Sequence, residues 1–553
     1  MKQTAASLLL LLAAVAPARA DLVVSKAPTS NVSCVAGVCT ATAAKAVLNA
    51  GDLAAMLASG DVTLESGALA KGINIHAGLS WASASRLTLE AKRAVSVTQP
   101  VIVEGPGGLT ISANSGYGIT GKGRVEFKDL SSSLIIDGQS YTLVNSVAGL
   151  AAVVAADFHA NVALAQSYDA GPDKTYRKPP VPTVFNGNFE GLGNSVSHLK
   201  LEARGTRSTD AIGLFADVDV SAVLRDIRMV DTVMTSSVES VGAGALAAYS
   251  GGTIVNAYAS GRFQSVAGRD ITAGGLVGEN GGTIVSSHSD VTLAAVSGDV
   301  GGLVGFNEGP IRDCSAGGAV SGSVSGGLVG DNEQPSTGTI ANSYATGAVQ
   351  NGGGLVGVNT STIQDSYATG NVTGDFAGGL VGGNAGTILA SFATGTATAT
   401  AQGTNAASAG GLVAMLYQST LHDSYATGAV SATAPVAYAG GLIGWSDSVD
   451  GASASIRNVY STGSVSSSDL LGGLIGRDDE DAGYIATAYW DLETSGVSNL
   501  GQGAGQPAND PGITGLSDTA LKSGLPAGFD PAVWAQSPSI NNGFPYLIAN
   551  PPQ

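Results

Sequence analysis

Three aspartates at equivalent positions of a repeated phrase are the residues of this chain that could cleave a polysaccharide. Asp313, Asp365 and Asp423 share one column of the repeat, and paired carboxylates serve as acid and base at a glycosidic bond. Such a site needs carboxylates, often with Arg or Lys, on neighbouring repeats. Ser343 and Ser391 intervene between the three aspartates. We therefore predict no catalytic residue and keep a polysaccharide lyase or hydrolase as the alternative function.

A histidine and a cysteine on successive repeats are the second candidate for chemistry. His288 and Cys314 occupy positions that other repeats give to an aromatic ring. They could form a metal or nucleophilic site, or they could be smaller side chains that fill the same half-buried slot. The second interpretation is favoured because free cysteine is among the most buried residue types. The other histidines, which are scattered along the chain, are His76, His159, His198 and His422. No His-Glu-x-x-His occurs, and we predict no metal ligand.

The remaining cysteines, Cys34 and Cys39, lie five residues apart in Ser-Cys-Val-Ala-Gly-Val-Cys-Thr. This spacing can close a small hairpin loop in an oxidising compartment, and a structural disulfide is favoured over two free thiols. A metal site would need further ligands, and no histidine lies nearby. Nothing in the sequence indicates a cofactor.

A recurring phrase determines what must position these residues. Gly-Gly-Leu-Val-Gly or a close variant occurs ten times, with intervals of 25 to 32 residues between the motif leucines, and Ser-Tyr-Ala-Thr-Gly or a variant usually follows. A period of this length marks a solenoid, in which each unit buries its apolar face against its neighbours. The motif leucines are Leu214, Leu246, Leu276, Leu303, Leu328, Leu355, Leu380, Leu412, Leu442 and Leu474.

Each repeat contains short alternating apolar segments separated by Gly and Asn, which indicates strands of three to five residues joined by tight turns. No segment has a helical period long enough for a helical repeat. We therefore predict an all-β protein, a right-handed parallel β-helix with coils about 4.8 Å apart, together with short helical insertions and capping elements.

Residues at equivalent positions should form ladders along this stack. We expect an amide ladder, a threonine column and an aromatic ladder. The amide ladder contains Asn280, Asn307, Asn332, Asn359 and Asn384; the threonine column contains Thr253, Thr283, Thr339, Thr362, Thr387 and Thr420; the aromatic ladder contains Tyr258, His288, Cys314, Tyr344, Tyr367, Phe392, Tyr425, Tyr460 and Tyr489.

The N-terminus predicts export. Lys2 begins a basic start, Leu8–Val15 is apolar, and Ala18-Arg19-Ala20 has the pattern of a cleavage site, so residues 1–20 are expected to be a secretory signal peptide. No later stretch reaches the ~18 apolar residues that a membrane-spanning helix needs. The mature chain is therefore expected to be secreted, at the cell surface or in the periplasm.

The amino-acid composition limits the classes of partner that this chain could bind. The chain is 44% hydrophobic and 12% charged, with 79 glycines and a net charge of −18. That hydrophobicity is enough to fold, so the glycines mark turns rather than disorder. The negative charge disfavours nucleic acid and anionic membranes, which attract basic surfaces.

Around the ten phrases, the chain divides into a signal peptide (1–20), an N-terminal cap with irregular coils (21–145), a helical excursion (146–205), the repeats (206–490) and a C-terminal cap (491–553). Three short helices are expected: one capped by Asp52 and ending at Leu57, one over Val147–Ala156, and one capped by Ser517 and ending at Leu521.

The repeated phrases resemble the GLUG repeat of bacterial surface and secreted proteins, including filamentous haemagglutinin-like adhesins and proteins with the peptidase domain of some immunoglobulin A proteases. Segments outside the repeats are similar to such proteins too: Trp81–Val103, Leu143–Leu150, Phe185–Leu201, Tyr489–Asp491 and Asn542–Leu547. The peptidase signature is absent, so the resemblance implies no protease activity. No Asn-Pro-Asn secretion motif and no autotransporter barrel accompany it.

These observations predict a secreted or surface-exposed adhesin-like protein that is not an enzyme. Its expected partner is a host or neighbouring cell surface, a matrix protein or a glycan, bound through the long face of the solenoid. An ice- or mineral-binding face is disfavoured because the Thr-x-Thr pattern occurs in one insertion only, at Thr396–Thr400.

Overall fold

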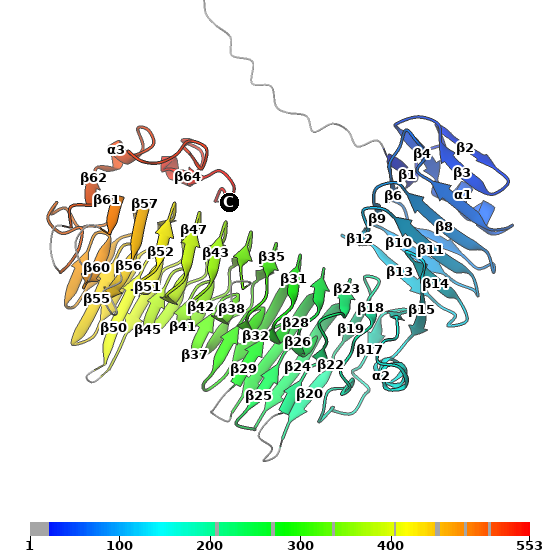
Figure 1. Ribbon diagram of the computed structural model, residues 1–553, viewed down its shortest axis with the longest axis horizontal. Helices are drawn as coiled ribbons and strands as arrows, with labels where there is room; N and C mark the ends of the chain where they lie inside the picture. The colour runs from blue at the N-terminus through cyan, green and yellow to red at the C-terminus, as the bar shows by residue number, and fades with distance from the viewer. Residues whose placement is uncertain are drawn as a thin grey trace, which may run out of the picture. The chain divides into compact units, whose positions relative to one another are not determined.

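The protein is an all-β solenoid. The computed structural model describes residues 21–552 except 205–209, 267–270, 334–337, 403–404, 448–453, 480–483 and 507–509, so the predicted signal peptide lies outside the described residues. Strands make up 51% of the chain and helices 5%, and they form a β-solenoid of about 16 turns (Figure 1). The predicted fold class, all-β with a solenoid and few short helices, is confirmed. The chain divides into two compact units, residues 1–143 and 144–553.

The first unit consists of short strands that are mostly parallel. Buried Leu, Ile and Val side chains alternate with more exposed ones along each strand, as in β11, where Leu109 and Ile111 are buried and Thr110 is half-buried. One sheet contains β12 (Tyr117–Ile119), β9 (Val95–Val97), β6 (Gly72–Ile75), β1 (Asp21–Ser25) and β4 (Ala46–Asn49), and a second contains β13 (Arg124–Phe127), β10 (Pro100–Val103) and β7 (Leu79–Trp81). The third row contains β3 (Val38–Ala41), β5 (Val62–Glu65), β8 (Arg86–Ala91), β11 (Gly108–Ala113) and β14 (Ser133–Ile136), with β2 (Val32–Val35) antiparallel to β3 and β15 (Gln139–Val144) antiparallel to β14.

Helix α1 (Ala50–Leu57) packs against β4, β5 and β7. The expectation that Asp52 caps it is wrong. The cap is Asn49, whose side-chain oxygen accepts hydrogen bonds from the Gly51 and Asp52 backbone amides. Asp52 lies in the first turn, where a carboxylate is favourable, and it accepts a hydrogen bond from the Thr29 hydroxyl.

The second unit stacks parallel strands in four rows. The first row is a ten-stranded sheet: β22 (Phe215–Val218), β26 (Ala247–Ser250), β30 (Val277–Asn280), β34 (Val304–Asn307), β38 (Val329–Asn332), β42 (Val356–Asn359), β46 (Val381–Asn384), β51 (Val413–Tyr417), β56 (Ile443–Asp447) and β60 (Ile475–Asp478). The second row contains β16 (Val162–Leu164), β18 (Asn188–Glu190), β23 (Val223–Arg225), β27 (Thr253–Val255), β31 (Thr283–Val285), β35 (Ile311–Arg312), β39 (Ile340–Ala341), β43 (Thr362–Gln364), β47 (Thr387–Leu389), β52 (Thr420–His422), β57 (Ser455–Ser461), β61 (Ile485–Asp491) and β62 (Ile513–Leu516).

The other two rows complete each coil. The third row contains β17 (Tyr168–Asp169), β19 (Ser195–Ser197), β24 (Arg228–Ser236), β28 (Tyr258–Ser265), β32 (His288–Ala294), β36 (Ser315–Ala316), β40 (Tyr344–Ala345), β44 (Tyr367–Ala368), β48 (Phe392–Ala393) and β53 (Tyr425–Ala426). The fourth row is double, with two lines of strands that merge in β37 (Val320–Gly326), β41 (Val349–Gly353) and β45 (Val372–Gly378). The first line contains β20 (Lys200–Ala203), the C-terminal parts of β24, β28 and β32, then the three merged strands, β49 (Ala397–Thr400), β54 (Val430–Thr433) and β58 (Val465–Ser467). The second line contains β21 (Asp210–Ile212), β25 (Val241–Ala243), β29 (Ile271–Gly274), β33 (Asp299–Gly301), the three merged strands, β50 (Ala406–Gly410), β55 (Val436–Gly440) and β59 (Leu470–Gly472).

The repeated phrase builds the corner between the fourth and first rows. The ten motif leucines are all fully buried. A Cβ on Gly353 would lie 2.1 Å from the Val356 carbonyl oxygen, and one on Gly354 would lie 2.1 Å from the Gly379 carbonyl oxygen. Only glycine therefore fits where the chain turns sharply against the next coil, and the following leucine points into the core.

The predicted amide ladder is confirmed. Each asparagine from Asn280 to Asn359 donates a side-chain hydrogen bond to the next asparagine's side-chain oxygen, at 2.7 to 2.8 Å. The second N–H of Asn359 donates to the Ser361 carbonyl. All five asparagines are buried. The column continues with Leu416 on the next coil, so the ladder ends at Asn384.

The aromatic ladder is confirmed from Tyr344 to Tyr460. The five rings, those of Tyr344, Tyr367, Phe392, Tyr425 and Tyr460, stack nearly parallel with centroids 4.9 to 5.0 Å apart. The C-terminal segment covers this ladder, because Phe529 and Trp534 pack against Tyr460. Its elements are α3 (Asp518–Leu521), β63 (Trp534–Ala535), the short helix Asn541–Gly543 and β64 (Tyr546–Leu547).

Two of the expected helices have the expected bounds. Helix α2 (Val147–Ala156) is capped by Ser146, and α3 is capped by Ser517. Among the described residues, no helix combines the length and the apolar character needed to cross a membrane.

Candidate functional site

One column on the outer face of the ten-stranded sheet varies from coil to coil while its neighbours repeat. It is formed by the third residue of each strand, and all ten residues are half-buried. We call it the outer column: Asp217, Tyr249, Glu279, Phe306, Asp331, Val358, Gly383, Met415, Trp445 and Arg477. Because the backbone is constant along it, the chemistry of this face is set by these side chains.

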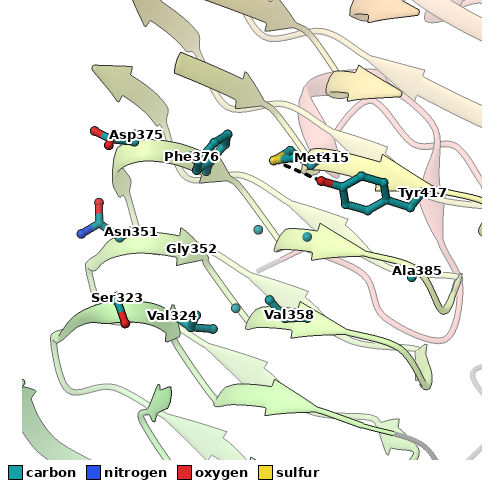
Figure 2. Close-up of a pocket in the computed structure, with 13 residues that line it drawn as sticks. Ser323, Val324, Asn351, Gly352, Val358, Asp375, Phe376, Ala385, Met415 and Tyr417 are labelled. Carbon is teal, nitrogen blue, oxygen red and sulfur yellow. Dashed lines mark hydrogen bonds between the residues drawn. The ribbon is translucent and has the colours of Figure 1, made fainter. Parts of the chain in front are cut away.

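The outer column has a gap at Gly383, where a cavity of about 500 Å³ opens. A Cβ added to Gly383 would contact only Val358, at 3.8 Å. Val358 and Met415 lie on the coils to either side, and Gly352 of β41 lies across the cavity (Figure 2). We call this cavity the notch. Its existence follows from two glycines at positions where other coils carry side chains.

The lining of the notch combines apolar and polar groups. Phe376 is 39% exposed, and the Tyr417 hydroxyl lies 3.6 Å from the Met415 sulfur (Figure 2). Ser323, Asn351 and Asp375 line one edge on successive coils. Among the described residues, Asp375 has no hydrogen-bond or ion-pair partner. Such a cavity can hold an uncharged group with an apolar face and offer it polar contacts at the edge.

Carboxylates gather beside the notch on the coils before it. Burial, with Asp299 and Glu333 nearby, raises the pKa of Asp331 to about 7. Burial also raises the pKa of Glu279 and of Asp299. An acid that keeps its proton near neutral pH could donate it in a reaction. Within the described ranges, no three His, Cys, Asp or Glu side chains are arranged to hold a metal ion.

A cluster of side chains around one arginine, Arg477, lies on the coils after the notch. Arg477 Nη1 donates a 2.6 Å hydrogen bond to the Tyr438 hydroxyl, and Arg477 Nε lies 2.7 Å from Asp479 Oδ2. Trp445 Nε1 donates to the same carboxylate oxygen at 2.9 Å. The arginine charge is therefore largely paired, and its plane lies near the Tyr438 and Trp445 rings.

The three aspartates of the sequence analysis share a column, but the column is structural. Asp313, Asp365 and Asp423 all have a positive φ, between 48° and 55°. The intervening coils place Asn342 and Ala390 there, also at positive φ, so the expectation that Ser343 and Ser391 intervene is wrong. Asp and Asn adopt this left-handed conformation more readily than most residues, which explains their presence at the turn.

Asp423 has a further structural role. Its Oδ1 accepts hydrogen bonds from Asn458 Nδ2 at 3.1 Å and from Trp534 Nε1 at 3.0 Å. The second bond ties the C-terminal segment to the solenoid across 111 residues. Burial raises the pKa of Asp365.

The assignment of Cys314 to the aromatic ladder is wrong. His288 pairs with Ser315, which in turn pairs with Tyr344. Cys314 lies in the adjacent serine column: its sulfur accepts a hydrogen bond from the Ser287 amide, and its own amide donates to the Ser343 hydroxyl. Burial raises the pKa of this thiol to about 12. His288 stacks on Tyr258, as predicted for the ladder, and its Nδ1 lies 2.7 Å from the Ser315 hydroxyl.

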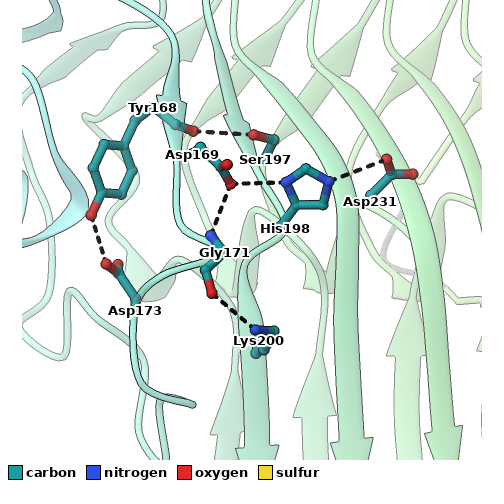
Figure 3. A network of polar contacts seen from close by, with 8 residues as sticks. All are labelled: Tyr168, Asp169, Gly171, Asp173, Ser197, His198, Lys200 and Asp231. Carbon is teal, nitrogen blue, oxygen red and sulfur yellow. Dashed lines mark hydrogen bonds and ion pairs between the residues drawn. The ribbon is translucent and has the colours of Figure 1, made fainter.

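His198 has charged neighbours that its sequence position did not indicate. Its Nδ1 lies 2.8 Å from Asp169 Oδ1, and its Nε2 lies 3.9 Å from Asp231 Oδ2, each on a neighbouring coil (Figure 3). The Gly171 amide and His198 lower the pKa of Asp169. All three side chains are more than half exposed, so the group is solvated rather than enclosed in a site.

Cys34 and Cys39 are joined by a disulfide across the β2–β3 hairpin, where they are directly opposed. The outer column and the notch were not predicted from the sequence. The signal was present in the third position of the strands, which varies among acidic, aromatic, aliphatic and glycine residues while the flanking positions repeat.

Comparison with known proteins gives two similarities. The family described as the GLUG motif matches residues 349–373, which span β41 to β44 and the start of β45. The chain is also similar to a "putative immunoglobulin A1 protease from Bacteroides ovatus", with 15% identity, a TM-score of 0.23, and 71% of this chain and 86% of that chain covered. No curated protein matches the chain. The GLUG resemblance is thus confirmed for one coil of the solenoid.

Proposed function

We propose that this chain is a secreted or surface-exposed adhesin-like protein that binds a cell-surface, matrix or glycan partner through the notch and the outer column. The supporting observation is the notch itself, a cavity of about 500 Å³ at the point where the outer column lacks a side chain. A repeating solenoid makes an extended binding face, and the notch is a place on that face where a group of the partner could be enclosed. Export by residues 1–20 would bring this face to the partner.

The binding test compares one side chain added at two places. Gly383→Leu fills the notch, and Gly281→Leu is the matched control, because a Cβ at Gly281 meets no atom within 4 Å. Purified residues 21–553 are incubated with glycans, matrix proteins and cells, and retention is measured. We expect saturable retention that Gly383→Leu reduces at least tenfold and Gly281→Leu leaves unchanged. Equal retention by both variants would place binding elsewhere.

The second candidate function is polysaccharide cleavage. Asp331, with a pKa of about 7, would be the acid, and the neighbouring Asp299 would be its partner carboxylate. Soluble sugar released in the same incubations, and lost in Asp331→Asn, would support this function. Retention without product would support the binding function.

A further inference from the structure

A second cavity, of about 320 Å³, adjoins the notch. It lies at the turns that lead from β42, β46 and β51 into the second row. Ala385 lines both cavities, and Tyr417 of the notch is followed directly by Gln418 of the second cavity. We call it the hydroxyl pocket. The two cavities therefore lie next to each other around the corner of the solenoid.

The hydroxyl pocket is lined by uncharged polar side chains. Six hydroxyls and one amide contribute to it, and no charged residue does: Thr360, Ser361, Thr362, Thr387, Ser419 and Thr420, with Gln418, Ala385 and Gly386 completing the lining. Hydroxyl and amide groups both donate and accept hydrogen bonds. They therefore suit a ligand that does the same without carrying charge.

Two residues of this pocket are in energetically unfavourable states. Ser419 is 5% exposed, and its hydroxyl has no hydrogen-bond partner among the described residues. A buried hydroxyl without a partner costs free energy, which a ligand hydroxyl would recover. Gln418 has a φ of 32°, in the region that non-glycine residues seldom adopt, and such backbone strain is often found at binding sites.

We propose that the notch and the hydroxyl pocket together bind a neutral oligosaccharide. This inference rests on the proposed binding function and names its ligand. A sugar ring has an apolar C–H face and a hydroxyl periphery. The apolar C–H face would pack against Phe376, Met415 and Tyr417 of the notch. The hydroxyl periphery would form hydrogen bonds with the side chains of the hydroxyl pocket.

The charges of the site select against acidic sugars. Asp375 is the one carboxylate that lines either of the two cavities as described. Asp331, which is partly ionised at neutral pH, lies on the outer column beside Val358. The chain carries a net charge of −18. A uronate chain would be repelled. A basic peptide would be attracted by these carboxylates, but it would leave the hydroxyl pocket without partners, so the sugar fits more of the site.

The test measures binding by titration calorimetry with cellohexaose, xylohexaose and mannohexaose as neutral probes, a galacturonate hexamer as the acidic probe, and a basic hexapeptide. Ser419→Ala removes the unpartnered hydroxyl. Ser446→Ala is its control, because Ser446 is also buried with an unpartnered hydroxyl but lines neither cavity. We expect at least one neutral hexamer to bind, about fivefold more weakly in Ser419→Ala, not at all in Gly383→Leu, and unchanged in Ser446→Ala.

The outcomes separate the two proposals. Retention on cells or matrix without binding of any neutral hexamer overturns the oligosaccharide inference and leaves the binding function standing. Preference for the galacturonate hexamer or the peptide also overturns it. Equal weakening by Ser419→Ala and Ser446→Ala would show that the serine acts through stability and not through contact with the sugar. Absence of retention on every partner would remove the binding function itself.

Discussion

Removing a side-chain amide from the middle of the asparagine ladder should lower the free energy of unfolding more than removing the last amide of the ladder. Asn359 accepts a hydrogen bond from Asn332 and donates to Asn384, at 2.8 and 2.7 Å. In Asn359→Ala, the Asn332 N–H and the Asn384 oxygen both lose their partner in a buried site. Ser361 keeps its bond from the Thr387 amide, so its carbonyl remains satisfied.

Asn384→Ala removes the same side chain one coil later, next to Leu416. It leaves one group without its ladder partner, the Asn359 N–H, because the Gly386 carbonyl keeps the Thr420 amide. A buried group left unsatisfied costs about 1–3 kcal/mol. Asn359→Ala should therefore lose about 2–6 kcal/mol and Asn384→Ala about 1–3 kcal/mol. Both lose the same atoms, so the packing costs largely cancel in the difference.

Urea unfolding followed by circular dichroism measures both losses, with the slope checked for each variant because a solenoid can unfold in parts. Hydrogen exchange of the amides in β42 and β46 shows whether the loss is local. Equal free-energy losses in the two variants would refute the ladder argument. A loss below 0.5 kcal/mol in Asn359→Ala, on the order of an ordinary surface substitution, would refute it as well.

Three further outcomes follow. The pKa of Asp331 rises on folding from 3.8 to about 7, so its charge destabilises the fold increasingly as pH rises through that window. A rise of this size corresponds to about 4 kcal/mol, which solvent screening reduces to about 1–2 kcal/mol. Asp331→Asn should therefore raise the free energy of unfolding by about 1–2 kcal/mol at pH 8 and by little at pH 4. A difference in urea midpoint between variant and parent that is the same at both pH values would contradict this. Cys314 should resist a thiol reagent at pH 8 in the folded chain and react once unfolded in urea; rapid labelling without urea would show that it is accessible. Trp534→Phe loses the hydrogen bond to Asp423, which is worth about 1.5–3 kcal/mol, so proteases should cut the C-terminal segment sooner, and an unchanged cleavage rate would show that the bond does not hold that segment.

The sequence determined the repeating part of this protein because parallel stacking puts equivalent residues of successive coils into register. A period of 25 to 32 residues with Gly-Gly-Leu predicts a solenoid that buries its leucines, and the equivalent positions of Asn280 to Asn384 on successive coils place their side chains within hydrogen-bond distance of one another. Helix caps at Ser146 and Ser517 are local interactions, so they too could be predicted. Cys314 was misplaced by one residue because its coil lacks the aromatic residue that marks the register in others, and pairing with the coils on either side was needed to correct it.

Tertiary structure alone decided which residues face one another across the cavities. The notch forms because Gly383 lies across a corner from Gly352, and nothing in the sequence near either glycine specifies what faces it. The hydroxyl pocket joins turns of three coils, and the bond between Asp423 and Trp534 spans 111 residues. Hydrogen bonds and cavities depend on distances between side chains that the chain brings together only when the coils have stacked, whereas the period and the residues of the ladders are present in the sequence itself.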